Sequence, residues 1–187
     1  KKYEVKLLLE MLAPRPDEYI LDVGCGTGVF SVDVLSSGAR LVGLDISHPM
    51  ITRVAHKTDD DQFAGVVGDM VSLPFPDESF DKVCSMTAIE FTADAEQAVA
   101  ELNRVVRRGG TVVLTSLNSK SPWAARRKKE GEKGHSLFQE ITFRSPDELA
   151  AIVPGDVTLK TAIHFLKSED PERIPETERL GNLQGKD

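Results

Sequence analysis

The 187-residue sequence is poor in features that several classes of protein require. Its two cysteines, Cys25 and Cys84, are too few for a disulfide scaffold and fit a reducing compartment, so we expect a cytoplasmic protein. No apolar run approaches the ~18 residues of a membrane-spanning helix, and we expect no membrane span. The four histidines are not spaced as metal ligands, with one another or with cysteine, and no metal site is predicted.

Positive charge is also in deficit. The sequence has 23 basic and 30 acidic residues, and its formal net charge of −7 opposes general binding to nucleic acids and anionic membranes. We interpret the basic run at residues 126–129 as the solvated face of a helix, with a grip on an anionic substrate as the alternative. The 40% apolar and 28% charged residues are those of an ordinary globular protein, and this length predicts a single domain over residues 1–187.

Apolar residues recur at two alternating spacings as far as residue 116. Helical spacing predicts helices over residues 2–13, from Phe30 to a cap at Gly38, from a cap at Ser47 to Ala55, and from Asp94 to a stop at Gly109-Gly110. Short apolar runs between them predict strands at residues 19–23, 41–44, 63–67, 80–86 and 111–115. This alternation predicts a doubly wound α/β fold, a mostly parallel sheet with helices on both faces.

The regular alternation ends at Ser116. Residues 117–140 are polar and rich in charged residues, and the residues from Ser145 to Glu148 have the serine, proline and glutamate of a capped helix start. Residues 157–165 alternate in polarity and predict a sixth strand. The polar tail that follows shows no strand pattern.

A glycine-rich loop follows the first predicted strand, and an acidic residue ends the second. Open parallel sheets bind ligands beyond the carboxyl ends of their strands, where the strand order reverses. Gly24, Gly26 and Gly28 let the backbone turn sharply and approach a ligand closely, because they carry no Cβ. Asp45 is placed to accept hydrogen bonds from two ribose hydroxyls. Together these features predict a cofactor that contains adenosine.

Two classes of cofactor compete for this loop. A dinucleotide site is typical of the spacing G-x-G-x-x-G, but here Val29 stands where the third glycine would fall. Asp22 lies two positions before the first glycine, where its carboxylate would repel a pyrophosphate and attract the ammonium of an amino-acid moiety. The pattern therefore favours an amino-acid-bearing cofactor, and a nicotinamide-dependent oxidoreductase stays as the alternative.

The string LDVGCGTG at residues 21–28 resembles motif I of the class I S-adenosylmethionine-dependent methyltransferases of type 11. The blocks VGLDIS (42–47), VVGDMVSLPFPDESFDKV (66–83) and LNRVVRRGGTVVLTS (102–116) are similar to those that follow in this family, closest to its ubiquinone and menaquinone biosynthesis branch. The resemblance covers residues 4–116. It implies in-line transfer of a methyl group from S-adenosylmethionine to a small-molecule acceptor, mainly through positioning and desolvation, with S-adenosylhomocysteine as product.

The resemblance also implies roles for individual residues. The backbone of the glycine loop and Met86 would line the methionine chain of the cofactor, Asp22 would orient its ammonium, and Asp45 would hold its ribose. Ile46, Asp69 and the Met70 amide would contact the adenine, although Asp69 could also simply begin a turn. The implied cofactor-binding residues are Asp22, Gly24, Cys25, Gly26, Thr27, Gly28, Asp45, Ile46, Asp69, Met70 and Met86.

In this family the segments before the first strand and after the fifth cover the substrate. The chain is accordingly divided into an N-terminal helix or lid (1–16), a cofactor-binding core (17–116), a substrate-side insertion (117–145) and a C-terminal part (146–187). Trp123, Phe138 and Phe143 would supply apolar walls for the acceptor. The family's seventh, antiparallel strand is not found in this sequence.

No catalytic residue is assigned from the sequence. Glu90 and His135 are candidates for a general base, which is needed only if the acceptor must lose a proton; Glu90 could instead pair with Arg104. Cys25 and Cys84 could form a redox pair, although buried reduced thiols are commoner. A domain that binds the cofactor without catalysis is a further hypothesis. The sequence does not indicate which oligomeric state the protein adopts.

Overall fold

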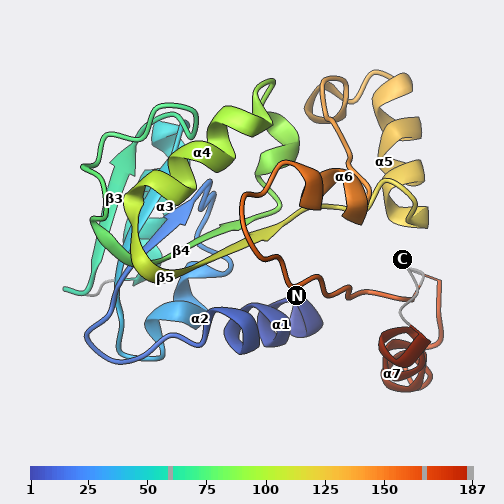
Figure 1. Ribbon diagram of the computed structural model, residues 1–187. Coiled ribbons are helices and arrows are strands. Elements are labelled where there is room, and N and C mark those ends of the chain that lie inside the picture. The colour runs from blue at the N-terminus through green and yellow to red at the C-terminus, as the bar shows by residue number, and fades with distance from the viewer. Residues whose placement is uncertain (59–60, 166–167, 185–187) are drawn as a thin grey trace. The chain divides into compact units, whose positions relative to one another are not determined.

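The computed structural model describes residues 1–58, 61–165 and 168–184, which form two compact units. One unit runs from Leu8 to Ser116, and the other combines Lys1–Leu7 with the chain from Leu117 onward. Figure 1 shows the strands gathered in the first unit, while the second is helical and irregular. The division into domains expected from the sequence stays a prediction.

The first unit is built on a parallel sheet of five strands in the order β3-β2-β1-β4-β5. The strands are β1 (Tyr19–Val23), β2 (Arg40–Asp45), β3 (Phe63–Val67), β4 (Phe80–Met86) and β5 (Val106–Thr115). The order reverses between β1 and β4: β1, the strand that leads into the glycine loop, pairs with β2 on one side and with β4 on the other. The doubly wound α/β prediction is confirmed, and the glycine loop lies at the switch point where such sheets bind ligands.

Helices pack on both faces of this sheet because successive strand residues point to opposite sides. Ile20 of β1 belongs to a buried cluster with Leu8, Leu12 and Val34, whereas Leu21 belongs to a second cluster on α4. Figure 1 shows α4 on one side of the sheet and α2 on the other. The helices of this part are α2 (Ser31–Leu35), α3 (His48–Thr58) and α4 (Ala95–Val105), with a short 3-10 turn η1 (Ile89–Phe91) and the end of α1 (Lys2–Leu12) from Leu8 onward.

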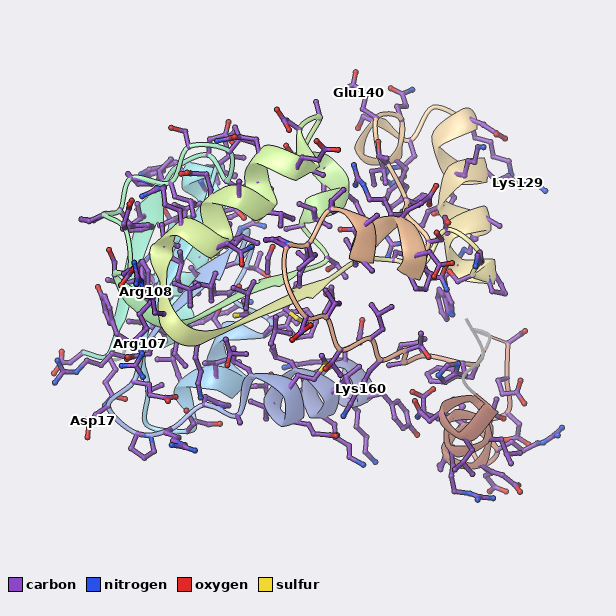
Figure 2. The ribbon with its side chains drawn as sticks, viewed as in Figure 1. Asp17, Arg107, Arg108, Lys129, Glu140 and Lys160 are labelled. Carbon is purple, nitrogen blue, oxygen red and sulfur yellow. The ribbon has the colours of Figure 1, made fainter. Side chains whose placement is uncertain are left out.

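The start of β5 differs from the prediction. The glycine pair was expected to end the preceding helix, but α4 ends at Val105 and the strand begins at once with Val106. The pairing with β4 jumps from Val106 to Thr111, so residues 107–110 bulge out of the ladder, with Gly109 at φ 73°. Figure 2 shows Arg107 and Arg108 on this bulge. The glycines therefore form a bulge, where a positive φ is needed, and not a helix end.

From Leu117 onward, the described residues of the second unit include three helices. They are α5 (Pro122–Glu132), α6 (Pro146–Ala151) and α7 (Ile174–Gln184), with a 3-10 turn η2 (Ser136–Phe138). The predicted cap is confirmed at Ser145, which exchanges hydrogen bonds with Glu148 in a complete capping box. Across the described ranges of both units, each helix is too short or too polar to cross a bilayer.

The predicted sixth strand is wrong. Residues 157–165 form no strand, and their backbone turns at Ile163, which has φ 69°. The amides of Ile163 and His164 donate to the buried carboxylate of Glu178 in α7, at 2.9 and 2.8 Å, and the indole N–H of Trp123 donates to the Phe165 carbonyl. Side chains thus hydrogen-bond the backbone groups that a sheet neighbour would otherwise satisfy, and the described residues include no sixth or seventh strand.

Removing one carboxylate oxygen from Glu178 tests this arrangement. In Glu178→Gln one of the two backbone N–H groups loses its acceptor, which we expect to cost about 1–3 kcal/mol. Amide exchange at Ile163 and His164 should accelerate at least tenfold, as measured by hydrogen–deuterium exchange. The exposed Glu176→Gln on the same helix is the matched control. Equal exchange rates in the two variants would contradict the assignment.

Candidate functional site

The glycine loop between β1 and α2 makes the sharp turn that the sequence predicts. Gly24, Gly26 and Gly28 all have positive φ, at 73°, 54° and 73°. The amides of Gly24 and Cys25 both donate to the carbonyl of Leu44 in β2, at 2.7 and 3.0 Å. The loop is therefore anchored to the end of the neighbouring strand.

The three glycines are not equivalent. A Cβ on Gly24 would overlap the Cβ of Ala88, and a Cβ on Gly28 would overlap Val54 of α3, so both positions are closed by packing. A Cβ on Gly26 would meet no atom within 4 Å. Gly26 is therefore the position at which a ligand can approach the backbone of the loop.

Asp45 lies against this open position. Its Oδ2 accepts the Gly26 amide at 2.8 Å, and its Oδ1 accepts the Ser47 amide at 2.9 Å. A carboxylate has about four acceptor sites, so each oxygen can accept a further hydrogen bond from a hydroxyl. The structure brings this residue to the loop from 19 positions away in the sequence, as the predicted ribose contact requires. Lys57 adds a hydrogen bond to the Thr27 carbonyl at 2.7 Å.

Asp22 is buried in the middle of the sheet, with 2% of its surface exposed. Its Oδ2 accepts a hydrogen bond from Ser31 at 2.6 Å, while its Oδ1 has no hydrogen-bond partner of good geometry among the described residues. Burial raises the pKa of Asp22 from 3.8 to about 6, against the lowering effect of the Ser31 hydroxyl and the Cys84 thiol; Asp45 adds a smaller increase. A cation beside Oδ1 would relieve this cost.

The predicted adenine contacts lie beyond the ends of β2 and β3. Ile46 is 72% exposed, which is unusual for a large apolar side chain and leaves it available to a planar ring. Asp69 is exposed and accepts the Val71 amide at 3.1 Å, so it does begin a turn, as the alternative interpretation held. The Met70 side chain reaches toward Gly24. The turn and an adenine contact at Asp69 are compatible.

Two further residues of the predicted set are buried in the core. Met86 packs in the cluster that contains Ile20 and Val34, and its sulfur accepts a hydrogen bond from Thr115 at 3.6 Å. Cys25 and Cys84 are free buried thiols, and burial raises the pKa of both, so they are protonated near neutral pH. A cofactor role for Met86 and Cys25 stays a prediction.

The candidates for a general base have different surroundings. Glu90 lies in η1 with 3% of its surface exposed, and His135 is an exposed residue of the other unit, stacked on Phe138. The suggested pairing of Glu90 with Arg104 is not what the structure describes, because that guanidinium binds Glu101 and Asp77.

The basic run lies on α5, and Figure 2 shows Lys129 projecting outward from it. Its four side chains are all exposed. In the described ranges no group of three His, Cys, Asp or Glu side chains could hold a metal ion.

Sequence reasoning missed the residues that support the loop from a distance. Ser31 and Lys57 bind Asp22 and the Thr27 carbonyl, and Ala88 fills the space above Gly24. None belongs to a pattern of spacing that points to the loop. Only the chain topology brings them there.

Comparison with known proteins places the core in a family. A family model described as a methyltransferase domain matches residues 21–114. The chain is 36% identical over 121 residues to a malonyl-[acyl-carrier protein] O-methyltransferase of Pseudescherichia vulneris, covering 65% of this chain and 47% of that protein. It is 36% identical over 116 residues to a demethylmenaquinone methyltransferase of Beutenbergia cavernae, covering 62% and 47%. The chain thus spans about half the length of these curated relatives.

Solved structures share the fold. A methyltransferase of Thermotoga maritima, described as a possible histamine N-methyltransferase, matches with a TM-score of 0.69 and 25% identity, over 81% of this chain and 67% of that one. A geranyl diphosphate C-methyltransferase of Streptomyces coelicolor, in complex with S-adenosyl-L-homocysteine, matches with a TM-score of 0.65 and 19% identity, over 80% and 58%. At the lower identity the likeness is one of fold alone.

The difference between the glycines can be tested by alanine substitution. Gly28→Ala combines positive φ with overlap of Val54, and we expect it to lower the free energy of unfolding by about 2–4 kcal/mol. Gly26→Ala meets only the strain of positive φ, about 1 kcal/mol, but its methyl group occupies the open position and should weaken ligand binding. Chemical denaturation measures both values. Equal destabilisation by the two substitutions would contradict the assignment of Gly26.

Proposed function

Because the chain belongs to the class I S-adenosylmethionine-dependent methyltransferases of type 11, we propose that it transfers a methyl group from S-adenosylmethionine to a small-molecule acceptor and releases S-adenosylhomocysteine. The observation that carries the proposal is the open backbone position at Gly26, which is hydrogen-bonded to Asp45 and lies in the loop that follows the buried Asp22. One end of an adenosyl amino acid needs a carboxylate for its ammonium, and the other needs a carboxylate for its ribose.

The buried carboxylate fits the ammonium end of this cofactor. Asp22 has one oxygen satisfied by Ser31 and one without a partner among the described residues, and its raised pKa reflects the cost of burying its charge. An ammonium at Oδ1 would satisfy the orphan oxygen and lower the pKa of the carboxyl. A dinucleotide would bring a pyrophosphate to the same loop and raise that cost further.

The remaining assignments follow the order of the strand ends. The backbone from Gly24 to Gly28, including Cys25 and Thr27, would line the methionine chain, with Met86 beneath it. Asp45 would accept the ribose hydroxyls with the oxygens that already accept the Gly26 and Ser47 amides. Ile46 would pack on the adenine, Asp69 would accept its amino group, and the Met70 amide would serve a ring nitrogen.

The chemistry of the reaction comes from the cofactor, which when bound supplies an activated methyl group and a neutral thioether leaving group. The chain's own residues would hold that group in line with the acceptor and exclude water from it, and orientation alone can supply much of the rate. Glu90 is the proposed proton acceptor if the acceptor must ionise, because it is buried just beyond β4.

We propose a small organic acceptor for this activity. The net charge of −7 opposes nucleic-acid substrates. The match to the malonyl-[acyl-carrier protein] O-methyltransferase covers 47% of that protein, so the rest of its length lies outside the comparison. One relative's name specifies a carrier-bound malonyl group and another a quinone, so the test panel includes a carrier-linked carboxylate beside phenols, quinols and amines.

Calorimetric titration and a transfer assay test the proposal together. S-adenosylmethionine and S-adenosylhomocysteine should bind with micromolar affinity and NAD should not, and a radiolabelled methyl group should pass to one member of the panel. Binding of NAD alone would contradict the proposal. Binding of the sulfonium cofactor with no transfer to any acceptor would favour a cofactor-binding domain without catalysis.

Asp22→Asn should stabilise the free protein while weakening the cofactor complex. The carboxyl of the folded protein holds its proton up to about pH 6, whereas in the unfolded chain it ionises near 3.8. The folded state therefore loses stability relative to the variant as the pH rises from about 4 to 6. At pH 7 the variant should be more stable by up to ~3 kcal/mol, and below pH 4 the difference should disappear, as urea denaturation will measure.

The same substitution should weaken binding of S-adenosylhomocysteine by about 10- to 100-fold, because it removes a charged partner of the ammonium. In the wild type this affinity should rise from pH 5 to pH 7 as Asp22 ionises. Asp17→Asn, at an exposed carboxylate, is the control for both measurements. A variant that binds as tightly as the wild type would remove Asp22 from the site.

A further inference from the structure

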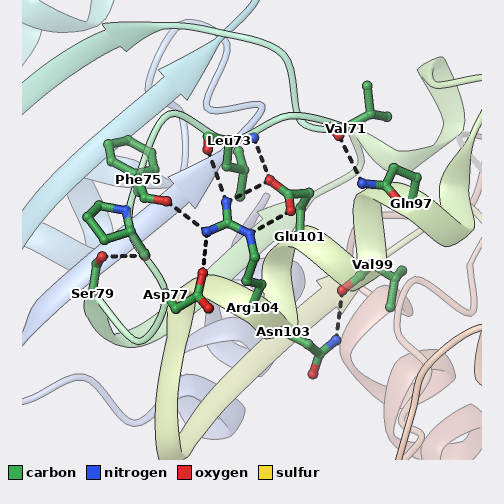
Figure 3. Close-up of polar contacts among 11 residues, drawn as sticks. Val71, Leu73, Phe75, Asp77, Ser79, Gln97, Val99, Glu101, Asn103 and Arg104 are labelled. Carbon is green, nitrogen blue, oxygen red and sulfur yellow. Dashed lines mark hydrogen bonds and ion pairs between the residues drawn. The ribbon is translucent and has the colours of Figure 1, made fainter.

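The segment that connects β3 to β4 is held by polar side chains of α4. Residues 69–79 form no regular strand, so their backbone groups have few partners in the sheet. Figure 3 shows Gln97, Glu101 and Arg104, all on one face of α4, directed at this segment. We refer to these three side chains as the α4 network.

Arg104 is the centre of the network. Its guanidinium donates to the carbonyls of Leu73 and Phe75, at 3.1 and 2.8 Å, and to the carboxylates of Asp77 and Glu101, at 2.9 and 2.6 Å. The planar guanidinium carries its donors in a fixed fork, so one side chain can hold several carbonyls in a defined arrangement. A lysine could not make the same set.

Glu101 binds Leu73, one of the residues that Arg104 also contacts. Its Oε2 accepts the Leu73 amide at 2.7 Å and also a hydrogen bond from Arg104 at 2.8 Å. The Glu101 side chain is 12% exposed, and the hydrogen bonds from Arg104 lower its pKa, so it stays ionised near neutral pH. Both backbone groups of Leu73 are thereby fixed by a charged pair, and charged hydrogen bonds are stronger than neutral ones.

Gln97 extends the hold to the turn that precedes Leu73. At the start of α4 the Asp94 side chain accepts the Gln97 backbone amide, but the Gln97 side chain does not return to the cap. The Gln97 amide group instead donates to the Val71 carbonyl at 3.3 Å. Val71 in turn donates to the Asp69 carboxylate, and the Ser72 amide donates to the Asp69 carbonyl.

These contacts link α4 to the residues assigned to the adenine. The network binds Val71 and Leu73, and Val71 is itself hydrogen-bonded to Asp69, whose neighbour Met70 reaches toward the glycine loop. The packing of α4 on the sheet depends on other residues, chiefly the buried Leu102 and Val105. Loss of the network should therefore loosen the turn while the helix stays in place.

We propose that Gln97, Glu101 and Arg104 are positioning residues that hold the Asp69–Ser72 turn in the conformation that recognises the adenine edge of the cofactor. This role rests on the proposed function, because it assigns the adenine to Asp69 and Met70. It predicts that the network determines selectivity for adenine as well as affinity.

Two ligands that differ only in the base test the role. S-adenosylhomocysteine carries the amino group that Asp69 would accept, and S-inosylhomocysteine carries a carbonyl there. The wild type should prefer the first by about 10- to 100-fold, the range expected when a hydrogen bond to a carboxylate is lost. Glu101→Gln and Arg104→Lys should reduce that preference about tenfold, and Gln97→Ala about threefold, with affinity for the inosine compound nearly unchanged.

Asn103→Ala is the matched control, because Asn103 lies on the same helix but donates only to the Val99 carbonyl within it. Gln97 is exposed, so its alanine variant will fold even if the charged pair proves necessary for folding. The positioning role, but not the proposed function, would be overturned if the wild type binds normally and the preference for S-adenosylhomocysteine is unchanged in Gln97→Ala and in every other network variant that folds. A wild type that binds neither ligand would overturn the proposed function and this role with it.

Discussion

The site depends on the parallel pairing of β1 with β2. This register continues past the strands as two hydrogen bonds, from the Gly24 and Cys25 amides to the Leu44 carbonyl, which fix the glycine loop to the end of the second strand. Asp45, the next residue, then meets the Gly26 amide. A shift of one residue in this pairing would turn Asp45 away from the loop, because strand side chains alternate between faces. The fold and the cofactor site therefore share one constraint.

The buried Asp22 carboxylate, which lies in β1, lowers the stability of the free protein. A carboxylate with one orphan oxygen inside a sheet destabilises the free protein, and the raised pKa is the sign of that cost. A strand selected for stability alone would carry an apolar residue at position 22, since its neighbours Leu21 and Val23 are fully buried and apolar. The fold tolerates the charge because hydrophobic packing on both faces is extensive. In the proposed complex, the ammonium of the cofactor would offset the cost.

The sequence predicted the strands well where an apolar run is bounded on both sides by turn residues. The bounds of β1, β3 and β4 match the prediction, because each is a short apolar run between clear turn residues. It failed at Val106, since a glycine pair signals a helix end and a bulge equally, and at residues 157–165, where alternation continues without a neighbouring strand. The difference among the three glycines and the contact of Gln97 with Val71 could not be read from spacing, because both depend on residues that only the topology brings near.

The most direct test of the account is the number of protons released when S-adenosylhomocysteine binds. Calorimetry at pH 6 in two buffers of different ionisation enthalpy gives this number. Asp22 is about half protonated in the free protein at that pH and ionised beside an ammonium, so the account predicts release of about half a proton per ligand, which disappears in Asp22→Asn. Tight binding with no proton release, or the same release from the variant, would contradict it.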